Sequence, residues 1–233
     1  MKRVRVYQNN LLIVGESIEL NKDNQKYLKK VLRLKNGFEL VVFNGDGFDY
    51  QAILENTQLN IISSNINNNE LTTNITLVQS IAKHDKMDFI IQKAVELGIK
   101  KITPIITKRV IVKLDEKKKL NRQLHWQKVA ISATEQCGRS IVPKIDFPIS
   151  FNEYLKNNTT NSFVLHHLAK KTLQEYPITT DINIVIGPEG GLTDDEIEQL
   201  EKNNHQALLL GKTVLRTETA SISAVSLLSL LWQ

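Results

Sequence analysis

The stretch that decides the fold is IGPEGGLT at residues 186–193, followed after a helix pattern by LGKTVLRTETA at residues 210–220. Each stretch begins where a short apolar run ends, and each precedes a pattern typical of a helix. Two successive units of strand, glycine turn and helix are typical of an open α/β sheet, which binds ligands at the carboxyl ends of its strands. Glycine at such a turn lets a ligand approach the main chain, because no Cβ is in the way. We therefore expect a small-molecule site here.

The residues of these turns argue against a nucleotide phosphate as the ligand. The sequence contains neither the G-x-x-x-x-G-K-[ST] loop nor the G-x-G-x-x-G loop. Pro188 lacks a backbone N–H donor, and the carboxylate of Glu189 would repel a phosphate. A sulfonium cofactor that carries a ribose fits this chemistry better. Thr193 and Glu196 have the spacing of a helix capping box, so a simple strand-to-helix turn is the competing interpretation of the first stretch.

Composition indicates an ordinary globular protein of one large or two modest domains. The chain has 233 residues, of which 41% are hydrophobic and 24% are charged, and its formal net charge is +5. No apolar run reaches transmembrane length, so we expect a cytoplasmic protein without membrane contact. The single Cys137 excludes an internal disulfide and a cysteine-rich zinc site. The adjacent His166 and His167 lack a second ligand cluster, and we expect no metal.

One short helix-like segment near the start of the chain is strongly basic. Residues 22–35 carry Lys22, Lys26, Lys29, Lys30, Arg33 and Lys35 against Asp23 alone. Such a segment in a chain of pI about 9.1 is typical of nucleic-acid binding, and a solvated helix face is the competing interpretation.

The pattern changes near residue 70, which predicts a first domain of residues 1–70 and a second of residues 71–233. The first reads as a small barrel with strands at 4–7, 38–43 and 48–54, a helix at 23–34 and a tight turn at 44–47. The second alternates strands and helices, which predicts a mostly parallel sheet with helices on both faces. Its strands are expected at 75–80, 102–106, 163–165, 182–186 and 207–210. Its helices are expected at 85–97, 115–136 and 217–232.

The last helix is apolar around most of its circumference, with Ser223, Ser226 and Ser229 as a narrow polar stripe. A helix of this kind is normally buried on more than one side. The second side is either the core of its own subunit or another subunit.

Together these residues resemble the ribosomal RNA small subunit methyltransferase E family of the SPOUT superfamily. The similarity includes both glycine stretches, QKAVELG at 92–98, EQCGR at 135–139 and Leu165-His166. It continues at the front of the chain in VLR at 31–33 and FNGDG at 43–47. One departure is Tyr27, which stands where the family often has a histidine and which can still stack on a base.

The resemblance implies an α/β SPOUT-type methyltransferase domain with a C-terminal trefoil knot, preceded by a small PUA-like β-barrel that holds RNA. It implies S-adenosylmethionine as cofactor, homodimers, and methylation of the imide nitrogen (N3) of a decoding-centre uridine in 16S rRNA. The partner would then be 16S rRNA or the small ribosomal subunit. Two alternatives stay open: a SPOUT enzyme that acts on tRNA or large-subunit rRNA, and a non-catalytic RNA-binding assembly factor.

The resemblance also assigns residues to roles. The expected cofactor-binding set is Leu165, His166, Gly187, Pro188, Glu189, Gly190, Gly191, Leu210, Gly211, Leu215 and Arg216. The expected RNA-binding set is Arg3, Arg5, Tyr27, Lys29, Lys30 and Arg33.

The uridine imide becomes a good nucleophile only when its proton leaves, and a cation near the carbonyl oxygens would stabilise the resulting anion. Arg216 and Arg139 are the candidates for this catalytic role, and each has a structural ion pair as its alternative, with Glu218 the neighbour of Arg216. For the catalytic base, Glu189, His166 and Glu135 all remain open.

Overall fold

The protein is described here from a computed structural model that covers residues 4–83, 85–112, 114–158 and 160–232. The chain forms two compact units. The first comprises residues 1–70 together with 134–142, and the second comprises residues 71–133 and 143–233. A segment from the middle of the chain therefore belongs to the first unit, which the pattern change near residue 70 does not reveal.

The first unit is built on a five-stranded sheet with the order β1-β3-β4-β5-β2. These strands are β1 (Arg5–Tyr7), β2 (Ser17–Glu19), β3 (Phe38–Phe43), β4 (Phe48–Glu55) and β5 (Gln58–Ile66). β1 and β3 are parallel and the other pairs are antiparallel. The turn predicted at 44–47 joins β3 to β4, and its Gly45 and Gly47 have φ values of 98° and 92°, which glycine adopts without strain.

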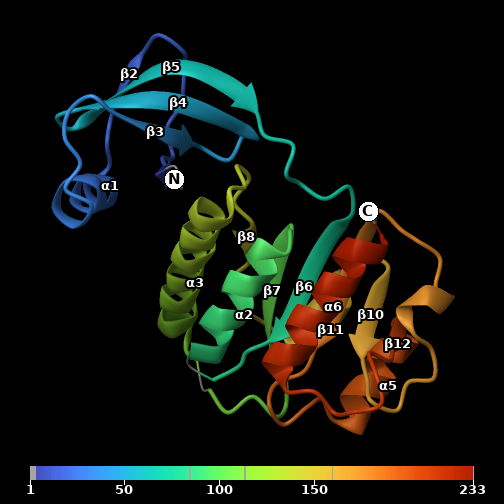
Figure 1. The fold of residues 1–233 in the computed structure, drawn as a ribbon. Coiled ribbons are helices and arrows are strands. Elements are labelled where there is room, and N and C mark those ends of the chain that lie inside the picture. Colours follow the sequence, from blue (N-terminus) through green and yellow to red (C-terminus); the bar gives the residue numbers. More distant parts are fainter. Residues whose placement is uncertain (1–3, 84, 113, 159, 233) are drawn as a thin grey trace. The chain divides into compact units, whose positions relative to one another are not determined.

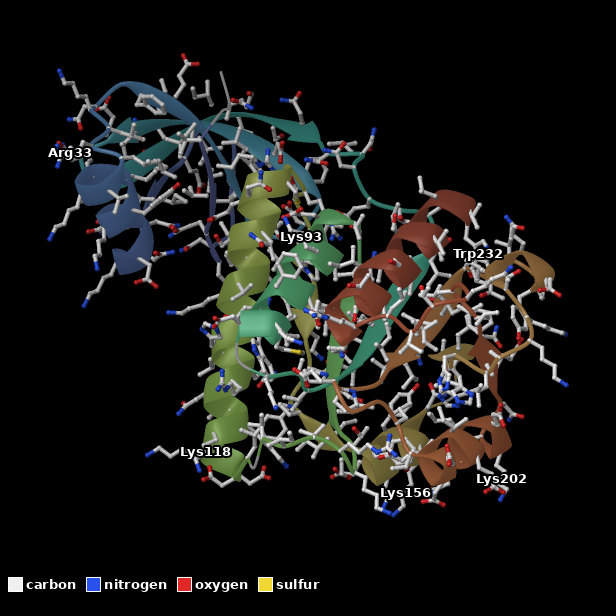
Figure 2. All side chains as sticks on the ribbon, turned by 60° about the horizontal axis from the view of Figure 1, so that its bottom comes forward. Arg33, Lys93, Lys118, Lys156, Lys202 and Trp232 are labelled. Carbon is white, nitrogen blue, oxygen red and sulfur yellow. The ribbon has the colours of Figure 1, made fainter. Side chains whose placement is uncertain are left out.

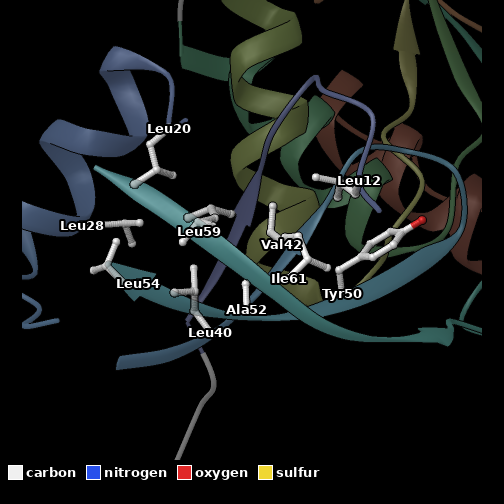
Figure 3. Close-up of a cluster of buried hydrophobic side chains, with 11 residues drawn as sticks. Leu12, Leu20, Leu28, Leu40, Val42, Tyr50, Ala52, Leu54, Leu59 and Ile61 are labelled. Atoms are coloured by element: carbon white, nitrogen blue, oxygen red, sulfur yellow. The ribbon is translucent and has the colours of Figure 1, made fainter. Parts of the chain in front are cut away.

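Alternation of buried and partly exposed side chains along β4 places one face of this sheet on a hydrophobic core (Figure 3). The core consists of Val6, Leu12, Leu20, Leu28, Leu40, Val42, Tyr50, Ala52, Leu54, Leu59 and Ile61. The hydroxyl of Tyr50 donates to Asp46 at 2.7 Å, and burial together with this carboxylate raises the pKa of Tyr50 to about 12.

The helix expected at 23–34 is shorter and of two kinds. It begins as α1 (Lys22–Gln25), capped by Asn21, and continues as the π-helix η1 (Lys26–Val31). The wide turn ends with the amide of Leu32 donating to the carbonyl of Tyr27, five residues back. Inward-facing Asn24 and Leu28 anchor it, since Asn24 donates to the carbonyl of Tyr7 at 2.7 Å and Leu28 is fully buried in the core.

The second unit contains a seven-stranded parallel sheet with the order β12-β10-β11-β6-β7-β8, and β9 also pairs with β7. These strands are β6 (Asn74–Ser80), β7 (Lys101–Ile106), β8 (Lys144–Ile145), β9 (Ile149–Ser150), β10 (Ser162–Leu165), β11 (Asp181–Ile186) and β12 (His205–Leu208). The five strands predicted from sequence are present, with β12 two residues earlier than expected, whereas β8 and β9 are too short to show a pattern.

Helices cover both faces of this sheet, as predicted. They are α2 (Asp85–Glu96), α3 (Glu116–Cys137), α4 (Phe151–Asn157), α5 (Asp194–Lys202) and α6 (Thr217–Leu231), and the 3₁₀ turn η2 (Leu173–Glu175) precedes β11. Helices α2 and α6 pack side by side, and α6 lies over β6 and β11 (Figure 1). On the other face, α4 and α5 bury Phe151 and Ile197 against Val78, Val164 and Val185 of the sheet.

Candidate functional site

A cavity of about 340 Å³ lies where β10, β11 and β12 end. The three strands are neighbours and parallel, so the loops that follow them meet at one edge of the sheet. The volume is within the range of small-molecule sites. Ten of the eleven residues expected to bind a cofactor line this cavity, namely Leu165, His166, Gly187, Pro188, Glu189, Gly190, Gly191, Leu210, Gly211 and Leu215. The eleventh, Arg216, does not line it.

A larger hollow of about 630 Å³ opens at the amino ends of the strands, and four of its polar groups bond to one another in pairs. Asn74 donates to Asp181 at 2.9 Å, and Thr103 donates to Asp146 at 2.8 Å. These groups are already satisfied, so the smaller cavity at the carboxyl ends is the better candidate for a ligand site.

The glycines of the first loop serve the geometry of the loop itself. A Cβ on Gly187 would lie 2.9 Å from the amide nitrogen of Leu192, which the backbone cannot accommodate. Gly191 has a φ of 71° and its amide donates to the carbonyl of Pro188, so it closes a turn. Gly211 differs, because a Cβ there would meet no protein atom within 4 Å. Gly211 is therefore the glycine at which a side chain could enter the space of a ligand.

The capping box predicted for Thr193 and Glu196 is present and begins α5. Glu196 is buried, and its second carboxylate oxygen accepts from the backbone amide of Lys108 at 2.7 Å. One carboxylate thus fixes the loop after β11 to the segment after β7.

Arg109 is a residue that the sequence interpretation missed. It lines the cavity, and its Nη1 donates to the carbonyls of Gly190 at 2.7 Å and Leu192 at 3.2 Å. A Cβ on Gly190 would also contact the Arg109 side chain at 3.4 Å. Arg109 therefore packs on the glycine loop and carries a positive charge to the cavity. Its position directly after strand β7, at the same sheet edge, is the one signal that could have indicated it.

Arg216 lies between the third loop and α6, where it is the N-cap residue and is exposed. The carboxylate of Glu218 forms its ion pair with Lys86, at 3.3 Å, and Lys86 also approaches Glu189 at 3.8 Å. The pKa of Glu218 is lowered by its own backbone amide and by Lys86, with a smaller contribution from the charge of Arg216. Within the residues that the structure describes, the Arg216 side chain forms no hydrogen bond or ion pair.

Of the three candidate bases, His166 and Glu189 line the cavity. Burial and the neighbouring His167 lower the pKa of His166, which favours the neutral ring. Glu189 accepts from the backbone amide of Lys83 at 3.0 Å. Glu135 instead belongs to the first unit, where it accepts from the amide of Tyr7 at 2.8 Å and burial raises its pKa.

Arg139, the second candidate for catalysis, is 3% exposed and lies in the first unit. Its Nε and Nη2 donate to the two carboxylate oxygens of Glu70 at 2.8 and 2.5 Å. Arg139 does not line the cavity. This geometry supports the structural alternative for Arg139.

The expected RNA-binding residues separate into two groups. Arg5 donates to both carboxylate oxygens of Asp49, at 2.6 and 2.8 Å, so little of its guanidinium is available to RNA. Tyr27, Lys30 and Arg33 are exposed along η1 and its end, and Figure 2 shows Arg33 beside this helix. Lys29 is half-buried and donates to Asn36 at 2.9 Å. Arg3 lies outside the described residues.

Across the described ranges, no group of three or more His, Cys, Asp or Glu side chains could hold a metal ion. The same residues contain no helix with the length and apolar character needed to cross a membrane.

Residues 69–229 match the family model described as RNA methyltransferase domain, and residues 20–63 match the one described as RNA methyltransferase PUA domain. The fold and the cavity thus define a protein of the RNA methyltransferase class. Ribosomal RNA small subunit methyltransferase E of Buchnera aphidicola is 34% identical over 96% of this chain and 92% of its own length. The Bacillus subtilis protein of the same name is 31% identical over 93% of this chain and 88% of its own length. The chain belongs to the ribosomal RNA small subunit methyltransferase E family.

Solved structures agree over the full fold. The enzyme of this name from Neisseria gonorrhoeae, bound to S-adenosylmethionine, has a TM-score of 0.92 and 33% identity, covering 99% of this chain and 98% of the other. A Legionella pneumophila protein solved with the same bound cofactor has a TM-score of 0.95 and 34% identity, covering 99% of this chain and 98% of the other.

Proposed function

We propose that this protein methylates N3 of a decoding-centre uridine in 16S rRNA, with S-adenosylmethionine as the methyl donor. The observation that carries the proposal is the cavity at the carboxyl ends of β10, β11 and β12, lined by ten of the residues expected from sequence to bind a cofactor. Relatives that share the fold over its whole length hold this cofactor.

The residues present fit such a cofactor. The cavity has apolar walls that suit an adenine ring, among them Ile186, Leu208 and Leu215. Gly211 leaves its main chain open to the ligand. When bound, the cofactor supplies a methyl group on a sulfonium, which is transferred by in-line displacement. The protein's contribution is to hold the reactants in line and to exclude water.

We assign the stabilisation of the uridine anion to Arg216. It follows the cavity residue Leu215 directly, and its guanidinium is not used by Glu218, which pairs with Lys86. An exposed, unpaired guanidinium can donate to a carbonyl oxygen that gains negative charge as the N3 proton leaves. Of the three candidate bases, neutral His166 and the carboxylate of Glu189 line the cavity and are able to accept that proton.

We assign RNA binding by the first unit to the outer face of η1. Tyr27 is 41% exposed beside Lys30 and Arg33, which combines an aromatic stacking surface with positive charge. This composition suits an RNA backbone with an unstacked base.

The proposal includes a SPOUT-type C-terminal trefoil knot, a homodimer and a cytoplasmic location. Exposed apolar side chains on the packed pair α2 and α6 support a second copy as partner, since Phe89 is 44% exposed and Leu230 is 69% exposed.

The deciding experiment is mass spectrometry of 16S rRNA from a strain that lacks this protein, with and without a plasmid that restores it. We expect loss of one N3-methyluridine and its return on complementation. Purified protein with tritiated S-adenosylmethionine and separated RNAs completes the test. Label in tRNA or 23S rRNA would identify another RNA substrate, and RNA binding without transfer would identify an assembly factor.

A further inference from the structure

A fully buried glutamine connects the segments of the second unit that form the cavity. Gln79 lies near the carboxyl end of β6 and has 0% exposure, yet it does not line the cavity. A primary amide offers two N–H donors and one acceptor oxygen, and each of them costs free energy when it is buried without a partner.

Every polar group of Gln79 has a partner, in β6, at the beginning of α6 or in the loop at Gly187. Its Nε2 lies 2.9 Å from the carbonyl oxygen of Ser80 and 3.1 Å from Oγ1 of Thr217. Its Oε1 lies 2.6 Å from the hydroxyl oxygen of Ser221. The amide therefore joins strand β6 to two successive turns at the beginning of α6.

Thr217 extends the connection to the glycine loop. Its hydroxyl accepts from Gln79 and donates to the carbonyl oxygen of Gly187 at 2.7 Å. Nε2 of Gln79 also lies 3.5 Å from that carbonyl oxygen. Gly187 begins the loop after β11, and Thr217 begins α6 directly after the third loop. One chain of hydrogen bonds thus fixes two cavity loops to each other and to β6.

We propose that Gln79 is a positioning residue for the cofactor site. It holds the beginning of α6 against the loop at Gly187, and so keeps the two loops at the separation that the cofactor needs. It acts through Thr217 and touches no ligand. Hydrogen bonds in a buried chain strengthen one another, so loss of the amide loosens both loops together. The inference rests on the proposed cofactor and is independent of which nucleotide is methylated.

The test measures S-adenosylmethionine affinity by calorimetry for Gln79→Met, Thr217→Val and the double variant. Gln79→Met keeps the side-chain length and removes all three polar groups. We expect each single variant to bind on the order of tenfold more weakly. If Gln79 acts through Thr217, the fold-loss of cofactor affinity in the double variant is clearly smaller than the product of the fold-losses in the two single variants.

Tyr154→Phe is the matched control. It removes the buried hydroxyl that lies 2.9 Å from His205, in the same unit and outside the cavity. It is expected to lower stability and to leave cofactor affinity unchanged. In steady-state assays, Gln79→Met should raise KM for the cofactor without raising KM for RNA, whereas simple destabilisation lowers only the active fraction.

The inference is overturned if folded Gln79→Met binds the cofactor as the wild type does. It is also overturned if the fold-loss of affinity in the double variant equals the product of the two single fold-losses. If Gln79→Met does not fold, Gln79→Asn takes its place, because it keeps a neutral amide but is one methylene too short to reach both Thr217 and Ser221. Failure of the wild type to bind the cofactor would instead contradict the proposed function.

Discussion

Nζ of Lys86 lies 3.3 Å from a carboxylate oxygen of Glu218 and forms an ion pair with it. Glu218 is the acidic residue two positions after Arg216. Arg216 itself is exposed at the start of α6, directly after the third loop. Glu218 therefore pairs with Lys86 and not with Arg216, which favours a role for the Arg216 guanidinium outside an ion pair.

Arg216→Ala should lower the single-turnover rate of methyl transfer by about a hundredfold or more, because a donor to the developing anion is lost. The melting temperature and cofactor affinity should stay close to those of the wild type. Arg216→Lys should restore only part of the rate, since an ammonium lacks the planar fork. Lys212→Ala, in the same loop, controls for general loss of charge. A lower melting temperature with normal transfer per folded molecule would make Arg216 structural.

Arg139→Ala should act on stability. It leaves the Glu70 carboxylate, which is 17% exposed, without its bidentate partner. Breaking a pair of this burial costs about 3 kcal/mol. Urea unfolding measures this loss, and Glu70→Gln should also destabilise the protein, because it removes the carboxylate that faces the buried Arg139 guanidinium. A hundredfold slower transfer in an Arg139→Ala protein of normal stability would return Arg139 to catalysis.

Gly211 and Gly187 should respond to side chains in opposite ways. Gly211→Leu has room in the protein and should abolish cofactor binding with an unchanged melting temperature, with Gly211→Ala intermediate. Gly187→Ala brings a Cβ against the Leu192 amide and should destabilise the protein even without ligand. Calorimetry and thermal melting of all three variants check this, and normal affinity in Gly211→Leu would exclude Gly211 from the site.

Charge reversal at Lys29 and Lys30 should weaken RNA binding and reduce its dependence on salt, because fewer counterions are released. Cofactor affinity should not change. The slope of log K against log salt should become shallower by roughly 0.7 for each lost phosphate contact. Charge reversal at Lys117 and Lys118 of α3 alters net charge equally and should leave the slope unchanged. Equal slopes in all three proteins would contradict RNA binding by η1.

Stability should fall in mild acid because His205 is buried with a lowered pKa, caused mainly by burial. At pH values above about 6.5, the pKa of histidine in the unfolded chain, His205 is neutral in both the folded and the unfolded protein and contributes nothing to the pH dependence of stability. Below it, the unfolded state takes up the proton first, so stability decreases as pH falls toward the folded pKa. The pH slope of urea unfolding between pH 7 and 5 should be smaller in His205→Gln. His166, whose pKa is also lowered, contributes to the slope that remains.

The elements with long, regular patterns could be predicted from sequence, and those that depend on tertiary contacts could not. The strands β6, β7 and β11 and the helices α2 and α6 follow apolar runs or periodic patterns. The two-residue strands β8 and β9 carry no such pattern. The π-helix η1 depends on how Asn24 and Leu28 are held, and sequence periodicity alone predicts an ordinary helix there.

The candidate site divides in the same way. Glycines after strands indicated the cavity, because a turn at the end of a strand is a local feature. Arg109 and Gln79 lie 81 and 108 residues before the Gly190 and Gly187 carbonyl oxygens that they approach, and the place of Arg109 shortly after β7 is the one local signal of these contacts. Their roles depend on strand order, which places β6 between β11 and β7.

The buried amide of Gln79 has a spectroscopic consequence. Both of its hydrogens are held by oxygen atoms and shielded from water, so their exchange with deuterium requires a local opening of the loops. Most glutamine side-chain amides at a protein surface exchange at once. A slowly exchanging pair of side-chain proton signals would therefore report the closed state of the cavity in the ligand-free protein, without an assay for methyl transfer.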